Sequence, residues 1–494
     1  MSSVTLNFAI GTASAALQIE GHLPPSNWDA WAGRGEVKDG TTPQRTTGHW
    51  ERWREDNALM SELGLQIARI SVEWARIEPR QGEFDEAALA RYHEEIADLR
   101  ARGIAPLVTL HHFGDPIWFE RLGGWPVEAN VDLFLRYVRH VVAALDDVVT
   151  DWITINEPNV FATGAYLFKE MPPGTVNWRH MMATLRNFAV AHIGAYQIIH
   201  EIQDSGEHRA KVAFAHHKRV FAPRNPKNPV HQAFTRFDEY MFHRIIEDAF
   251  YTGHFSPALG RPKRSVTPGL YADAIGLNYY SRTAVSGITD GAFPGQTYTD
   301  LGWEVYPQGI VECVRELSER FPELPIWVTE NGTADNGFEG PVANTLPAGE
   351  QPLYPEGIGH GLESGPGAGP NTHTAAHGAA SGASAADGNS SGGKHSHGGQ
   401  RNKADIPMLE RFRCDFLVAH WEAMAASGLP FERYYHWCFV DNWEWTEGMV
   451  PRFGIVWLDR DSLERTPKPS AYMMRDVIKA GGITSEIRAR YCHA

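Results

Sequence analysis

Eight short apolar segments, each followed by a stretch of helical periodicity, limit most strongly how this 494-residue chain can fold. The segments are rich in β-branched and aromatic residues and cover 8–13, 67–72, 105–110, 152–155, 212–215, 274–277, 326–329 and 434–439. The clearest helical patterns cover 87–102, 131–144, 181–201, 307–320 and 408–427. Strands that alternate with helices indicate an α/β fold, and a count of eight favours a closed (β/α)₈ TIM barrel. We predict one barrel domain over 1–494.

One segment, 339–403, departs from this alternation. It consists largely of Gly, Ala, Ser, Pro, His and Asn, so it cannot bury enough apolar surface to offset its ordering entropy. We therefore expect a low-complexity loop inserted after the seventh strand. Its histidines could chelate a metal or belong to a solvated spacer, and we favour the spacer: His360, His373, His377, His395 and His397. No metal or other cofactor is predicted.

Charge and cysteine content exclude several classes of function. The net charge of −15 argues against nucleic acid or an anionic membrane as a partner, and it is compatible with a neutral small molecule. The four cysteines are too few and too scattered for a disulfide framework or a zinc site. The N-terminus lacks a basic region, and no run of 18 apolar residues occurs. We expect a cytoplasmic protein and leave its oligomeric state open.

Two glutamates stand where an apolar strand meets a turn. Glu157 lies in Thr-Ile-Asn-Glu-Pro at 154–158, and Glu330 lies in Val-Thr-Glu-Asn-Gly at 328–332. In a barrel these positions lie on the C-terminal rim, where active sites are found. A single such glutamate could simply satisfy the backbone of a loop. Two of them, after the fourth and seventh strands, would face each other across the barrel mouth.

Further motifs make the sequence resemble glycoside hydrolase family 1, whose acid/base lies in T-x-N-E-P and whose nucleophile lies in T/I-E-N-G. The matching segments are 11–21, 69–74 (RISVEW), 109–116 (TLHHFGDP), 278–280 (NYY) and 441–454 (DNWEWTEGMVPRFG). The resemblance covers nearly the whole chain outside the insertion. Two positions differ from the usual pattern: Phe113 replaces a tryptophan, and Asn159 stands where many members carry an aromatic residue.

The resemblance implies a retaining β-glycosidase that acts on small β-glycosides or oligosaccharides. Terminal non-reducing β-D-glucosyl residues are the expected substrate, with galactosyl and fucosyl residues as further possibilities. Glu330 would attack the anomeric carbon while Glu157 protonates the leaving oxygen. Arg69 and Tyr280 match the residues that contact the nucleophile, and both should lower the pKa of Glu330. The charge of Glu330 should raise the pKa of Glu157.

The resemblance also implies a set of residues that bind the substrate. Polar groups at the −1 subsite would come from Gln18, His112, Asn156, Tyr280, Glu444 and the indole N–H of Trp445, with Trp437 as the stacking floor. Asn156 would bond the 2-hydroxyl, a contact that strengthens in the transition state. Trp303 is the candidate platform for the aglycone at the +1 subsite.

Three other functions compete with this one. A 6-phospho-β-glycosidase would carry a Ser, Lys and Tyr clamp in the C-terminal loop, where this chain has Glu444, which would repel a phosphate. A plant-type thioglucosidase would replace Glu157 with a neutral amide. A catalytically silent sugar-binding protein on the same fold is disfavoured because both glutamates are present.

Overall fold

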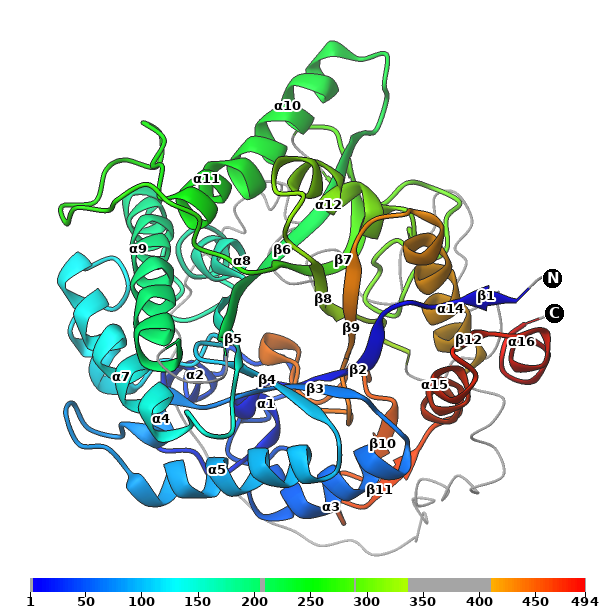
Figure 1. The fold of residues 1–494 in the computed structure, drawn as a ribbon. Helices are drawn as coiled ribbons and strands as arrows, with labels where there is room; N and C mark the ends of the chain where they lie inside the picture. The colour runs from blue at the N-terminus through cyan, green and yellow to red at the C-terminus, as the bar shows by residue number, and fades with distance from the viewer. Residues whose placement is uncertain (1–2, 205–208, 288–289, 336–409, 494) are drawn as a thin grey trace, which may run out of the picture.

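A computed structural model describes residues 3–204, 209–287, 290–335 and 410–493 of the chain. The predicted insertion at 339–403 lies outside the described residues. Eight parallel strands close into a barrel in the order β2-β3-β4-β5-β6-β7-β8-β9, as the apolar segments predict. Figure 1 shows this ring of strands surrounded by helices. The strands are β2 (Ala9–Ala13), β3 (Ile67–Ser71), β4 (Ala105–Thr109), β5 (Asp151–Asn156), β6 (Lys211–Pro223), β7 (Ile275–Val285), β8 (Ile326–Asn331) and β9 (Phe431–Trp437).

The helices expected from periodicity are present. They are α5 (Glu86–Ala101), α7 (Val131–Ala144), α9 (Trp178–Gln203), α12 (Gly309–Arg320) and α14 (Arg411–Ala426). The start of the segment predicted at 408–427 lies outside the described residues. In α7 the buried residues recur every three or four positions, which is the spacing of one helix face: Val131, Phe134, Tyr137, Val138, Val141 and Val142.

Shorter or less periodic elements complete the fold. The other helices are α1 (Ala16–Ile19), α2 (Asn27–Ala32), α3 (His49–Glu62), α4 (Trp74–Ile77), α6 (Ile117–Arg121), α8 (Pro158–Thr163), α10 (Pro229–Glu239), α11 (Ile245–Thr252), α15 (Pro469–Ala480) and α16 (Ser485–Tyr491). Short helical turns are η1 (Glu128–Asn130), η2 (Gly164–Phe168), η3 (Tyr240–Arg244) and η5 (Trp445–Glu447). Two small antiparallel pairs lie outside the barrel: β1 (Val4–Thr5) with β12 (Gly482–Ile483), and β10 (Val456–Leu458) with β11 (Arg465–Pro467). No helix in the described part of the chain is long and apolar enough to cross a membrane.

Strands β6 and β7 are much longer than predicted. The sequence indicated a strand over 212–215 and another over 274–277, yet β6 continues to Pro223 and β7 to Val285. Their extensions pair with each other beyond a shift in register, from Val220 with Arg282 to Pro223 with Val285. Each extension begins with polar side chains, at His216–Arg219 in β6 and at Asn278 in β7, so the first apolar run ends before the strand does.

A buried histidine joins two of the outer helices. His49 of α3 contacts Asp56 of the same helix at 2.7 Å and Glu95 of α5 at 2.8 Å. Burial alone would lower the pKa of His49, but the carboxylates of Glu95 and Asp56 outweigh burial and raise it to about 9. The folded protein therefore binds a proton at His49 that the unfolded chain releases near pH 6.5.

This raised pKa predicts a loss of stability at alkaline pH. The contribution of His49 should be complete below pH 6.5 and should vanish as the pH rises through about 9, a change of about 3 kcal/mol. Thermal unfolding of the wild type and His49→Gln between pH 6 and pH 10 checks this. The gap between their melting temperatures should narrow as the pH rises, and a constant gap would contradict the prediction.

Candidate active site

Two buried glutamates line one narrow cavity at the C-terminal ends of the strands. Glu157 directly follows β5, the fourth barrel strand. Glu330 is the second-to-last residue of β8, the seventh barrel strand. Their exposed fractions are 4% and 3%. The cavity lining contains seven further residues: His112, Phe113, Asn156, Tyr280, Trp437, Glu444 and Trp445. The fold thus brings both candidate catalytic carboxyls and most of the candidate sugar-binding residues together.

Glu330 is held by two donors that the sequence analysis named. Arg69 of β3 donates from Nη1 to Glu330 Oε1 at 2.6 Å, and the Tyr280 hydroxyl of β7 donates to Oε2 at 2.6 Å. His112 Nε2 lies 3.9 Å from Oε1. Gly332 lets the end of β8 pack closely, because a Cβ there would lie 2.0 Å from the carbonyl oxygen of Trp437.

The pKa of Glu330 is raised rather than lowered. Burial, together with the neighbouring charge of Glu157, raises it to about 7. Arg69 and Tyr280 do lower it, as expected, but they do not outweigh burial. Because like charges repel in one buried cavity, ionisation of Glu157 opposes ionisation of Glu330. Two strong donors on Glu330 favour placing the charge there.

Glu157 has a different set of partners. Asn278 of β7 donates from Nδ2 to Glu157 Oε1 at 2.8 Å, and His217 Nδ1 of β6 lies 3.0 Å from the same oxygen. Neither partner is among the residues predicted from the sequence. His217 stands in the part of β6 where the apolar pattern gives no signal, and Asn278 could have been inferred from the N-Y-Y motif.

Backbone strain is concentrated at this cavity. Phe113, Glu157 and Trp445 have φ values of 66°, 44° and 52°, in the left-handed region that side chains other than glycine rarely adopt. They are three of the six described non-glycine residues with positive φ. Such strain persists only where the surrounding structure imposes it, and it tends to occur at functional sites.

A chain of hydrogen bonds joins the surroundings of the two glutamates. Arg69 Nη2 donates to Asn156 Oδ1 at 2.7 Å, and Asn278 Nδ2 donates to the same oxygen at 3.1 Å. Asn156 Nδ2 lies 3.0 Å from His112 Nε2. Because a guanidinium can only donate, Arg69 identifies the Asn156 atom as the acceptor and therefore the Asn278 atom as the donor.

Glu444 is held on both oxygens by candidate sugar-binding residues. Trp437 Nε1 donates to Oε1 at 3.0 Å, and Gln18 Nε2 donates to Oε2 at 3.3 Å. Burial, together with the charge of Glu330, raises the pKa of Glu444 to about 8 although the two donors lower it. Gln18 contacts Glu444 without being part of the cavity lining.

Trp303 and the two atypical positions lie around the cavity. Trp303 packs against Tyr280 and Phe453, with ring centroids 5.4 and 6.0 Å apart, and it is buried outside the lining residues. Phe113 belongs to the lining. Asn159 donates to the carbonyl oxygens of His217 and Phe242, so it connects β6 to η3 instead of entering the cavity.

Comparison with known proteins places this arrangement in a family. The model of glycosyl hydrolase family 1 matches residues 2–345 and 399–483. The chain belongs to glycosyl hydrolase family 1. The unmatched stretch between 345 and 399 falls within the predicted insertion.

Three distant relatives of this family 1 glycosidase match it along nearly their whole length. Beta-glucosidase A of Thermotoga maritima is 26% identical over 503 residues, covering 96% of this chain and 98% of the relative. A beta-galactosidase of Saccharolobus solfataricus is 24% identical, covering 99% and 97%. Among solved structures, a beta-glycosidase from Pyrococcus horikoshii is 26% identical, with a TM-score of 0.74 and coverage of 100% and 99%.

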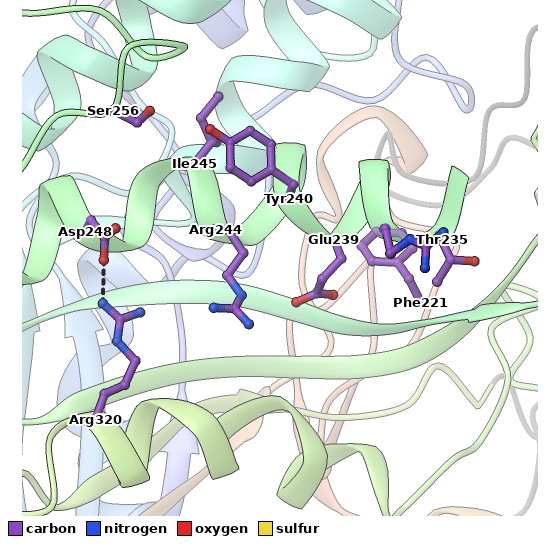
Figure 2. A pocket seen from close by; sticks show the side chains of 10 residues that line it. Phe221, Thr235, Glu239, Tyr240, Arg244, Ile245, Asp248, Ser256 and Arg320 are labelled. Carbon is purple, nitrogen blue, oxygen red and sulfur yellow. Dashed lines mark hydrogen bonds and ion pairs between the residues drawn. The ribbon is translucent and has the colours of Figure 1, made fainter. Parts of the chain in front are cut away.

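A larger cavity lies elsewhere on this family 1 chain. It has a volume of about 580 Å³ and is lined mainly by η3, α10 and α11, with Phe221 of β6 and Arg320 of α12. Figure 2 shows Arg320 paired with Asp248 there. Arg244 pairs with Glu316. Because it lacks a pair of carboxyls at strand ends, it does not have the chemistry of the barrel site.

Within the described ranges, no group of three or more His, Cys, Asp and Glu side chains is arranged to hold a metal ion. The predicted histidines of the insertion lie outside those ranges.

Proposed function

We propose that this family 1 member is a retaining β-glycosidase that hydrolyses terminal non-reducing β-D-glucosyl residues. The observation that carries the proposal is the unequal environment of two buried glutamates in one cavity. Glu330 accepts hydrogen bonds from the guanidinium of Arg69 and the hydroxyl of Tyr280, whereas Glu157 contacts the amide of Asn278 and the imidazole of His217. Environments that separate the ionisation of two carboxyls also separate their roles.

In the first half of the reaction, Glu330 acts as the nucleophile. Its carboxylate attacks the anomeric carbon and forms a glycosyl ester while the bond to the leaving oxygen breaks. Glu157 donates its proton to that oxygen, so the aglycone leaves as a neutral alcohol. Arg69 and Tyr280 stabilise the ionised form of Glu330, which is the form that attacks.

In the second half, the roles follow from the loss of charge at Glu330. Once Glu330 is an ester, it no longer repels a negative charge on Glu157. Glu157 can then take a proton from water, whose oxygen attacks the anomeric carbon and releases the sugar. The free carboxylate of Glu330 and the proton on Glu157 are restored, which closes the cycle.

The surrounding residues supply sugar recognition in this proposal. Asn156 and His112 reach the side of the cavity next to Glu330, where a 2-hydroxyl would lie. Glu444, Gln18 and Trp445 would bind the more distant hydroxyls, and Trp437 would stack on the sugar face. Trp303 would support the aglycone next to Tyr280.

Glucosides are proposed first, and galactosides and fucosides are included as possible substrates. One relative is named a beta-glucosidase and another a beta-galactosidase, both at low identity. A phosphorylated sugar is disfavoured because Glu444, which lines the cavity, offers a phosphate no positive charge.

The direct test is release of nitrophenol from 4-nitrophenyl β-D-glucopyranoside in the presence of EDTA. The β-galactoside, the β-fucoside and the 6-phospho-β-glucoside serve as comparison substrates. Turnover of a neutral β-glycoside supports the proposal and identifies the sugar. A folded protein that binds these sugars but turns over none of the substrates would favour the silent sugar-binding protein.

Two successive displacements at one carbon predict retention of configuration. Proton NMR of the anomeric region during the first minutes of hydrolysis should show the β-anomer of the free sugar before mutarotation produces the α-anomer. An initial α-anomer would mean a single displacement by water and would exclude Glu330 as the nucleophile.

A further inference from the structure

His217 contacts Glu157, the candidate acid/base, from the part of β6 that extends beyond the predicted strand. Its Nδ1 lies 3.0 Å from Glu157 Oε1, and both side chains are buried. The imidazole is held between two rings: it stacks on Tyr280 with centroids 5.8 Å apart and meets Phe242 edge-on at 5.9 Å. The backbone is fixed as well, because the His217 carbonyl accepts a hydrogen bond from Asn159.

The proton on the imidazole can be located from its surroundings. Burial holds the pKa of His217 well below its usual value, and Arg219 and His243 lower it further, so the ring is neutral and carries one N–H. Nε2 has no hydrogen-bond partner among the residues that the structure describes. A buried N–H without a partner is rarer than a buried acceptor without one, so the proton belongs on Nδ1.

The polarity of the bonds at Glu157 Oε1 is set independently. Arg69 fixes Asn156 Oδ1 as an acceptor, which fixes Asn278 Nδ2 as a donor, and that donor also reaches Glu157 Oε1. With His217 Nδ1–H directed at the same atom, Oε1 accepts from two sides. A carbonyl oxygen suits two donors better than the hydroxyl oxygen of a carboxylic acid does.

We propose that His217 is a positioning residue that, together with Asn278, keeps Glu157 Oε1 as the carbonyl oxygen and so places the acidic proton on Oε2. Glu157 then holds its proton on the oxygen opposite these two donors. The same N–H stabilises the carboxylate that forms when the proton leaves, which makes Glu157 a stronger acid. The inference deepens the proposed function and rests on it for the role of Glu157.

Two variants of His217 distinguish the effect of its N–H donor from the effect of its aromatic ring. His217→Asn keeps a donor near the place of Nδ1, whereas His217→Phe keeps an aromatic ring against Tyr280 and Phe242 but removes the donor. Removing the donor should lower kcat/KM for phenyl β-glucoside by roughly ten- to a hundredfold. For 2,4-dinitrophenyl β-glucoside, whose leaving group needs no proton, kcat/KM should change little. His217→Asn should restore most of the phenyl glucoside activity.

The pH profile provides a readout that a purely structural role would not change. Losing a donor to the carboxylate raises the pKa of Glu157, so the alkaline limb of kcat/KM should move to higher pH in His217→Phe. A shift to lower pH would mean that His217 accepts the proton of Glu157, which overturns the proposal. Equal losses on both substrates would also overturn it, because they would indicate a disturbed fold.

A measurement on the wild type keeps this test independent of activity. In protein labelled with ¹⁵N-histidine, the imidazole signals absent from His217→Asn belong to His217. Their chemical shifts distinguish a protonated Nδ1, which is expected, from a protonated Nε2, which would refute the proposal. If the wild type turns over no glycoside, the proposed function fails while the tautomer result still stands.

Discussion

Replacing Glu330 by alanine is expected to remove turnover of aryl β-glycosides, lowering kcat by roughly four orders of magnitude or more. The loss follows because the proposed mechanism forms the glycosyl ester on Glu330, and because Arg69 and Tyr280 are arranged around this carboxylate. Steady-state hydrolysis of 4-nitrophenyl β-D-glucopyranoside measures the effect. An exposed glutamate of similar position in the sequence, Glu323, provides the matched control, and Glu323→Ala should leave kcat unchanged.

The role of Glu330 can be separated from its contribution to folding. Removing one partner of a buried ion pair destabilises a protein by about 3–5 kcal/mol, so Glu330→Gln, which can still accept from Arg69, is needed beside the alanine variant. Both should be inactive, with melting measurements showing that Glu330→Gln is folded. Azide added to Glu330→Ala should yield the α-glycosyl azide, because it attacks from the same face. Activity above a tenth of the wild type would exclude Glu330 as the nucleophile.

Substitution of Glu157 should have an effect that depends on the leaving group. For phenyl β-glucoside, Glu157→Gln should lower kcat/KM by about 10²–10⁴-fold, the range for loss of a general acid. For 2,4-dinitrophenyl β-glucoside the loss in kcat/KM should be about tenfold or less, because its phenolate leaves without a proton. The two substrates on one variant control for any change in folding.

The second half of the reaction gives a further check on Glu157. Without a base, the glycosyl ester should accumulate and slow the steady state after a burst of dinitrophenol. Azide should accelerate this step in Glu157→Ala and give the β-glycosyl azide, the opposite anomer to that expected from Glu330→Ala. An equal loss of kcat/KM on both substrates would contradict the acid role.

The barrel could be predicted because its strands are buried on both faces and read as apolar runs. The predicted bounds of α7 match the structure, since its buried residues follow a helical spacing without interruption. The extensions of β6 and β7 could not be predicted, because they carry residues such as His217, Lys218 and Arg219 whose burial depends on partners elsewhere in the chain. Lys218, for example, is buried against Glu247.

The residues of the candidate site differ in how much of their role could be predicted from the sequence. Glu157 and Glu330 stand out because a carboxyl directly follows an apolar strand. Arg69 and Tyr280 could be paired with Glu330 only through the family resemblance, and the net rise in the pKa of Glu330 required knowing how deeply it is buried. His217 was missed because a histidine in a polar stretch resembles a surface residue until the fold places it against Glu157.

The shared acceptor atom Asn156 Oδ1 has a consequence for how this site can vary through evolution. Arg69 and Asn278 both donate to Asn156 Oδ1, and each of them also donates to one of the two glutamates. Replacing Arg69, Asn156 or Asn278 leaves hydrogen-bonding groups of the other two without a partner. The loss of stability in a double variant should therefore be smaller than the sum of the losses in the two single variants. We therefore expect these three residues to change together or not at all during evolution, while the residues that surround them vary more freely.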